Sequence, residues 1–279
     1  MKTAYIRPID SPESMIDTIR RVGIIPFFHN PVTGWSIQDL TRQGCWFTDE
    51  EEGGCLGPWD WKIDAIREGD ILYGKFLSNK AAFATPEWYR HLMNWRRSLP
   101  RMRMALGEAF KGTSQTDLLA KYLSPVLLSE IRKSRSLESS RVKHILMENV
   151  PQEVRAKVGG FMAKYLCPTV KKTACDNVLL YLEMGTWVVV GDFERVYKGP
   201  NLEYKGWQRS TLTTPEEILG TEPLGGSEPS WARKFLKETG GLESSMPDCT
   251  PAESLELIID HIVSVSGCTD RQTVLKFVK

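Results

Sequence analysis

At 279 residues, 41% of them hydrophobic, the chain is long enough to bury one large core or two modest ones. No apolar run approaches the roughly 20 residues that a membrane-spanning helix needs, and the first residues lack the apolar stretch of a secretory signal, so we expect a cytoplasmic protein. The six cysteines form no CxxC pair and the four histidines are scattered, so the sequence predicts no metal site and no cofactor.

The net charge of +1 conceals an uneven distribution along the chain. Residues 1–70 carry 7 Lys and Arg against 12 Asp and Glu, residues 71–175 carry 19 against 7, and residues 176–279 carry 10 against 16. A basic middle between acidic ends predicts a surface that attracts DNA or RNA. The alternative is internal pairing, in which the acidic ends neutralise the basic middle.

The first third of the chain predicts a helix, a short apolar strand and a hairpin. Ser11 as the N-cap and Pro12 in the first turn predict the start of a helix, which ends at Gly23. Residues 24–28 are apolar, but Pro26 makes them a poor central strand. We expect His29, which follows, to be a hydrogen-bonded structural residue rather than a catalyst. Residues 36–42 suit a short helix, and residues 71–77 and 81–84 suit a β-hairpin.

Five of the nine tryptophans lie between residues 46 and 97, and they form either part of the core or the wall of a pocket. The candidate pocket comprises Trp46, Trp59, Asp60, Trp61 and Lys75. Lys75 lies either exposed on the polar side of the hairpin or at the edge of a Trp-lined cleft, paired with Asp60 or a phosphate.

A helix beginning at Thr85 places Trp88, Leu92 and Trp95 on one face, which leaves Arg90 and Arg97 on a basic face. That face is either simply solvated or contacts phosphates. After a linker at 111–116, helical patterns cover residues 118–122, 127–133, 142–150 and 154–166. A fifth helix is capped by Thr173 and ended by Gly185.

The hydrophobic period then changes from 3.6 to 2, which predicts a two-stranded ribbon over residues 186–213. This order of elements, helices followed by a two-stranded ribbon, is typical of a winged-helix unit. In such a unit the helix before the ribbon reads the major groove. Thr214 and Thr250 each open a capping-box helix, the second ending near Gly267, and residues 221–249 suit a linker.

The sequence therefore predicts an α+β fold of tandem winged-helix-like units with small β-hairpins. The predicted parts are an aromatic-rich N-terminal domain at 1–112, a winged-helix domain at 113–222, and a linker with a C-terminal helix at 223–279. The candidate nucleic-acid contacts are basic residues of the middle and the ribbon: Lys75, Arg90, Arg96, Arg97, Arg101, Lys171, Lys172, Arg195, Lys198 and Arg209.

Several stretches, over roughly residues 15–220, carry a family resemblance: VGIIPFF, PWDWK, LYGKF, TPEWY with NWRR, LLSEIRK, and LLYLEMGTWVVVGDFERVYKG. They resemble a bacterial winged-helix family related to the AlkZ-type DNA glycosylases. That resemblance implies tandem winged-helix units and binding to double-stranded DNA, with a transcriptional or repair-associated role.

The glycosylases of this kind carry two polar catalytic residues, one residue apart, after the first helix. Pro26 and Phe28 occupy the matching positions here, and neither can position water or stabilise a developing charge. The resemblance therefore implies a non-catalytic relative, or one whose chemistry has moved. The alternatives are a glycosylase that uses other residues, such as Asp39 or Asp60 beside the tryptophans, and a protein-interaction module. The oligomeric state is open.

Overall fold

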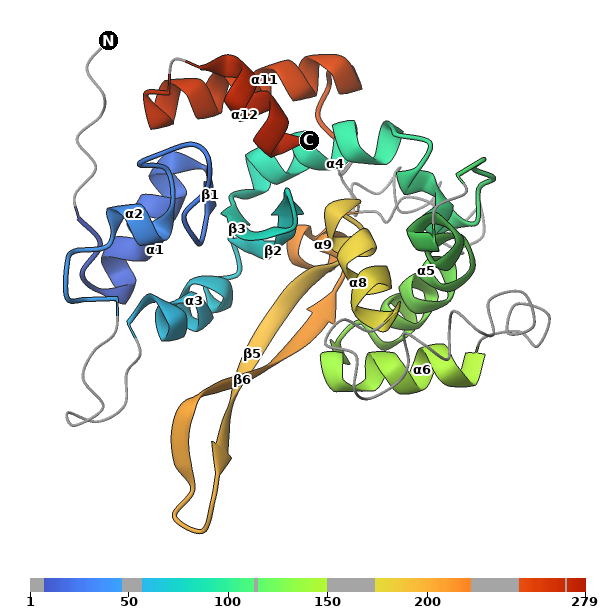
Figure 1. The fold of residues 1–279 in the computed structure, drawn as a ribbon, viewed down its shortest axis with the longest axis horizontal. Helices are drawn as coiled ribbons and strands as arrows, with labels where there is room; N and C mark the ends of the chain where they lie inside the picture. The colour runs from blue at the N-terminus through green and yellow to red at the C-terminus, as the bar shows by residue number, and fades with distance from the viewer. Residues whose placement is uncertain (1–7, 47–56, 113–114, 150–173, 222–245, 269) are drawn as a thin grey trace.

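The computed structural model describes residues 8–46, 57–112, 115–149, 174–221, 246–268 and 270–279 (Figure 1). In chain order, the helices are α1 (Pro12–Val22), α2 (Ile37–Leu40), α3 (Pro58–Arg67), α4 (Pro86–Ser98), the 3-10 helix η2 (Met102–Leu106), α5 (Gln115–Ser134), the 3-10 helix η3 (Ser139–Arg141), α6 (Val142–Asn149), α8 (Ala174–Met184), α9 (Pro215–Leu219), α11 (Pro251–Ser266) and α12 (Arg271–Val278). The strands are β1 (Ile24–Pro26), β2 (Leu72–Leu77), β3 (Lys80–Ala84), β4 (Leu137–Glu138), β5 (Val189–Lys198) and β6 (Glu203–Thr213). This mixture confirms the α+β class.

One antiparallel sheet joins both predicted hairpins, with the strand order β1-β3-β2-β5-β6-β4. Each hairpin is confirmed, and the two meet where Tyr73 of β2 pairs with Val190 of β5. β1 lies at one edge, where Pro26 is tolerated because an edge strand leaves one side of its backbone unpaired. The sheet thus connects the first two predicted parts of the chain, whose boundaries stay a prediction.

The β5–β6 hairpin extends far beyond the sheet and projects from the body of the molecule, past α3 on one side and α6 on the other (Figure 1). Its register shifts twice, first at Gly191 and again between Arg195 and Tyr197. At the second shift, β5 advances two positions from Arg195 to Tyr197 while β6 advances four from Gln208 to Tyr204, so β6 carries the bulge. Gly206 lies in this bulge with a φ of 74°, which a side chain would resist.

Local capping follows the predictions in part. Ser11 caps α1, and Thr250 forms a capping box with Glu253 at the start of α11. Thr214 holds the N-cap position of α9 but makes no side-chain cap hydrogen bond, so a capping box is wrong there. Residues 115–134 form one helix that contains Pro125, rather than two short ones.

The prediction also differs from the structure at the C-terminus, and part of it lies outside the described residues. α12 follows α11 and is an addition to the prediction; its buried Val274, Phe277 and Val278 do recur at helical spacing, but over only eight residues. The predicted helix at 154–166 and its neighbour's cap at Thr173 lie outside the described residues. Across the ranges given above, no helix combines the length and apolarity needed to cross a membrane.

The predicted basic face of α4 is wrong at Arg97, and the nearby candidate contact Arg96 is wrong as well, because each is only 2% exposed. Helix α4 lies between the sheet and α11, so both of its long sides are covered. Arg96 donates to the carbonyl oxygens of Phe76 and Val278, and burial lowers its pKa to about 10. A buried guanidinium needs such partners because water no longer solvates it.

Arg97 is bonded to groups that precede β5 and follow β6. Its guanidinium forms an ion pair with Glu216 of α9, with Nη1 and Oε1 2.5 Å apart, and donates to the carbonyl of Thr186 at 2.6 Å. It also lies 4.3 Å from the centre of the Trp187 ring. The pair ties α4 to the segments on either side of the β5–β6 hairpin.

Candidate nucleic-acid interface

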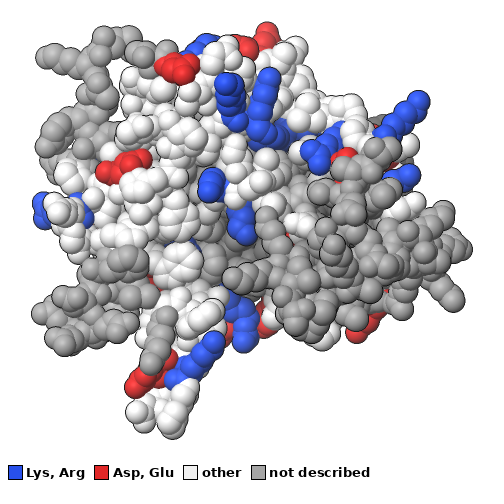
Figure 2. Space-filling view, in the orientation of Figure 1, with Lys and Arg blue, Asp and Glu red and all other residues white. Residues whose placement is uncertain are grey.

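Basic side chains follow the middle of one face, from the end near α11 down to the hairpin (Figure 2). In the outer half of the hairpin, three large apolar side chains are exposed: Tyr197 by 53%, Leu202 by 70% and Trp207 by 60%. Lys198 lies over Trp207, with Nζ 4.3 Å from the ring centre. An exposed aromatic side chain beside a cation is suited to stack on a base while the cation meets a phosphate.

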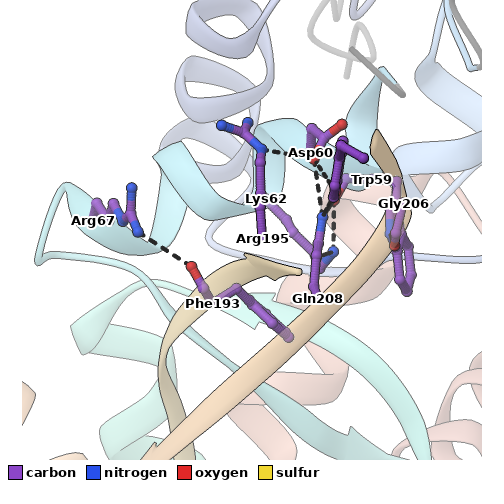
Figure 3. Close-up of polar contacts among 9 residues, drawn as sticks. Trp59, Asp60, Lys62, Arg67, Phe193, Arg195, Gly206 and Gln208 are labelled. Atoms are coloured by element: carbon purple, nitrogen blue, oxygen red, sulfur yellow. Dashed lines mark hydrogen bonds and ion pairs between the residues drawn. The ribbon is translucent and has the colours of Figure 1, made fainter. Parts of the chain in front are cut away.

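Helix α3 holds the hairpin through its first turn (Figure 3). The indole of Trp59 donates to the carbonyl of Gly206 at 2.9 Å, which places the bulge of β6 against the helix. Asp60 is 1% exposed, and its Oδ1 accepts from Tyr204 at 2.6 Å, Gln208 at 3.0 Å and Arg195 at 3.2 Å. Because a buried carboxylate must be paired, these contacts fix both strands relative to α3.

Lys62 lies at the centre of the same contact. Its side chain has no exposed surface, and Nζ donates to the Trp59 carbonyl at 2.6 Å and to the side-chain oxygen of Gln208. The ammonium lies 3.5 Å from the centre of the Trp59 ring and 4.6 Å from that of Phe193. Burial lowers the pKa of Lys62 to about 7, against the opposing attraction of Asp60.

A fourth contact lies at the end of α3. Arg67 pairs with Asp192 at 2.9 Å and donates to the carbonyl of Phe193 at 3.2 Å (Figure 3). The helix therefore meets β5 between Asp192 and Arg195 and β6 between Tyr204 and Gln208. The direction in which the hairpin projects is set by side-chain contacts before any ligand binds.

The predicted nucleic-acid contacts fall into separate groups. Arg195, Lys198 and Arg209 lie exposed on the hairpin, where Arg195 also pairs with Asp60, and Arg209 lies 3.8 Å from Glu138. The remaining exposed or half-buried members lie elsewhere: Lys75 on β2, Arg90 on α4 and Arg101 before η2. Lys171 and Lys172 lie outside the described residues, and Arg96 and Arg97 are buried.

The candidate pocket is corrected at two of its members. Lys75 is exposed on β2, and its charge acts on Glu183 of α8 rather than on Asp60. The lysine that lies over a tryptophan of this cluster is Lys62, over Trp59. Trp61 is 6% exposed and belongs to the core, whereas Trp46 and Trp59 are partly buried and both contact Phe27, at 5.5 and 6.2 Å between ring centres.

Four site residues go beyond those expected from the sequence: Lys62, Tyr204, Gln208 and Trp207. Lys62 stands in the run PWDWK, but helical spacing alone does not show that its side chain turns back over Trp59. The contacts of Tyr204 and Gln208 with Asp60 join residues 144 and 148 positions apart. Only Trp207 had a local signal, as a large aromatic residue beside Gly206 in a predicted ribbon.

Fold and site together define an α+β protein with a projecting, aromatic-tipped hairpin held by a buried polar network. The family model described as AlkZ related matches residues 9–279, and the chain belongs to that family. The match confirms the resemblance. None of the curated proteins or solved structures compared with the chain gives a significant match.

Proposed function

We propose that this protein binds duplex DNA through the β5–β6 hairpin, as the wing of a winged-helix-like unit, in a repair-associated role. The observation that carries the proposal is the preset hairpin, which exposes Tyr197, Leu202 and Trp207 beside Lys198. Soluble proteins rarely leave several large apolar side chains exposed on one short projecting segment without a partner. Membership of the AlkZ-related family supports DNA as that partner.

The hairpin is a better candidate for the DNA contact than the helix that precedes it. Four side chains of α8 are nearly inaccessible: Val178, Tyr181, Leu182 and Glu183. A recognition helix must present side chains to the major groove. We therefore place the main contact on the wing, with phosphates held by Lys198 and Arg209 and the aromatic side chains against the bases or sugars.

Catalysis by the usual residues of AlkZ-type glycosylases is not expected. Pro26 lies in β1 opposite Ala82, and Phe28 is 37% exposed but apolar. The rival function, a protein-interaction module, would use the same exposed tip but without dependence on the basic residues. Salt dependence separates the two, because DNA binding releases counterions and weakens steeply as salt rises.

Fluorescence anisotropy with a labelled duplex at two or more salt concentrations tests the proposal. The slope of log K against log salt is negative. We expect Lys198→Gln and Arg209→Gln each to make it shallower, by roughly 0.9 per lost phosphate contact. Trp207→Ala should weaken binding with little change in slope, because the ring carries no charge. Lys276→Gln, an exposed lysine on α12 at the other end of the molecule, is the matched control. Absence of binding at low salt would refute the proposal.

A further inference from the structure

Where α3 meets the hairpin, two cations share one buried carboxylate. Asp60 of α3 is 1% exposed, and its Oδ1 lies 3.2 Å from Nε of Arg195 in β5. Its negative charge also attracts the ammonium of Lys62, two positions along the same helix. Among the residues that the structure describes, Asp60 and Arg195 are the charged groups that act on Lys62. One negative charge is therefore opposed by two positive charges at a place that little water reaches.

Lys62 can give up its proton without losing a hydrogen bond. Nζ donates to the carbonyl of Trp59 and to the side-chain oxygen of Gln208, and a neutral amine has two hydrogens for these two acceptors. Burial lowers the pKa of Lys62 to about 7, which the attraction of Asp60 opposes and repulsion by Arg195 reinforces. Near neutral pH, the charged and neutral forms of Lys62 therefore both fit this geometry, and the nearby charges decide between them.

Arg195 faces the solvent as well as Asp60. Its side chain is 40% exposed, and its Nη atoms lie on the side away from the carboxylate (Figure 3). Within the described part of the chain, these Nη atoms have no hydrogen-bond partner. Arg195 also lines a hollow in the hairpin surface with Glu194, Val196, Tyr197, Leu202 and Arg209. Its guanidinium is therefore placed to meet a phosphate on the surface that carries the exposed apolar side chains.

The charge of Lys62 compensates Asp60 when Arg195 turns to a phosphate. Asp60 then keeps the hydrogen bonds from the neutral side chains of Tyr204 and Gln208 but loses its ion pair. A buried carboxylate without a counter-charge is unfavourable. A proton on Lys62 restores the counter-charge, and the departure of Arg195 removes a repulsion that opposes this proton. Phosphate binding at Arg195 and protonation of Lys62 therefore favour each other.

We propose that Arg195 exchanges Asp60 for a phosphate of the DNA backbone, and that Lys62 takes up a proton from the solvent as it does so; this rests on the proposed DNA binding. Below about pH 7, Lys62 already carries its proton in the free protein, and binding takes up little. Above pH 7, Lys62 is neutral in the free protein and must acquire the proton when DNA binds. The affinity for DNA therefore falls as the pH rises above 7.

The test measures Kd for a labelled duplex by fluorescence anisotropy at pH 7 and pH 8.5, at one ionic strength. The Kd of the parent chain should rise by about 10-fold, because uptake of one proton weakens binding by at most tenfold per pH unit. Arg195→Gln should weaken binding at pH 7 and abolish most of this pH dependence. Arg209→Gln is the matched control, since Arg209 pairs with Glu138 rather than with Asp60. It should weaken binding and keep the pH dependence.

The proton itself is counted without any substitution. Calorimetric titration of the parent chain with duplex at pH 8, in two buffers of different ionisation enthalpy, should show uptake of roughly 0.5 to 1 proton. Lys62→Met, if its melting temperature shows a folded chain, should take up none. Binding of the parent chain without proton uptake, or full pH dependence in Arg195→Gln, overturns the exchange and leaves DNA binding intact. Failure to bind duplex at pH 7 and low salt overturns the proposed function itself.

Discussion

The ammonium group of Lys62 in α3 donates a hydrogen bond to the side-chain oxygen of Gln208 in β6, although 146 residues separate the two. The contact closes a network in which the amide nitrogen of Gln208 donates to Asp60 and to the carbonyl of Trp59. Trp59, Asp60 and Lys62 of α3 are thereby all bonded to one side chain of β6. The hairpin is therefore fixed by a small number of buried contacts. One of them contains Lys62, whose protonation state changes with the pH of the solvent.

Lys62 should make the protein more stable as the pH rises above 7. Its pKa is about 7 in the folded chain and 10.5 when unfolded, so between these values the unfolded chain binds more protons and a rise in pH favours folding. Urea unfolding should show a free energy of unfolding that rises by roughly 1 kcal/mol per pH unit between pH 8 and 10, relative to Lys62→Met. Lys80→Met, at the exposed turn of the other hairpin, should keep the full slope.

Glu183 should act in the opposite direction over a lower pH range. It is 4% exposed, and burial raises its pKa from 4.5 to about 7, against the opposing charge of Lys75. The folded chain then binds more protons than the unfolded chain, so stability falls as the pH rises from about 4.5 to 7. Glu183→Gln should remove this fall in urea unfolding, whereas Glu194→Gln, exposed on β5, should not. Parallel curves for Glu183→Gln and the parent chain would contradict the assignment.

Arg97→Met should destabilise the protein by about 3–5 kcal/mol, because it leaves the buried Glu216 carboxylate without its partner. Arg67→Met removes an ion pair whose side chains are 55% and 44% exposed, and it should cost about 1 kcal/mol or less. Chemical unfolding of both variants measures the difference. For folded Arg97→Met, the salt dependence of DNA binding should be unchanged, since this arginine does not reach the surface. A reduced slope would restore Arg97 as a phosphate contact.

Local patterns in the sequence determined many of the elements. Ser11 with Pro12 and Thr250 with Glu253 specify helix starts through groups within four residues of each other. The alternating residues of the two hairpins likewise specify strands, and Pro26 specifies an edge. Such elements can be predicted from the sequence because the interacting residues are close along the chain. The resemblance of runs such as PWDWK and LYGKF identified the family in the same way.

Burial, by contrast, was decided by the tertiary structure. The helical spacing of α4 places Arg97 opposite Trp88 and predicts an exposed basic face, but packing by the sheet and α11 covers both sides, and Glu216 compensates the charge. The same holds for lysines: Lys75 and Lys62 both lie near tryptophans in sequence, and only the approach of β6 decides which one is buried. A periodic pattern shows which residues share a face, but not what covers that face.

The sequence by itself determined the α+β class, the family, most helix starts and the existence of a projecting ribbon. Only the tertiary structure assembled Asp60 with Tyr204 and Gln208, and gave His29 a supporting carboxylate at Asp39. The physical reason is that side-chain hydrogen bonds act over about 3 Å, whereas Asp60 and its partner Gln208 lie 148 positions apart along the chain. Which polar residues are structural and which are free to act is therefore settled by folding, not by residue type.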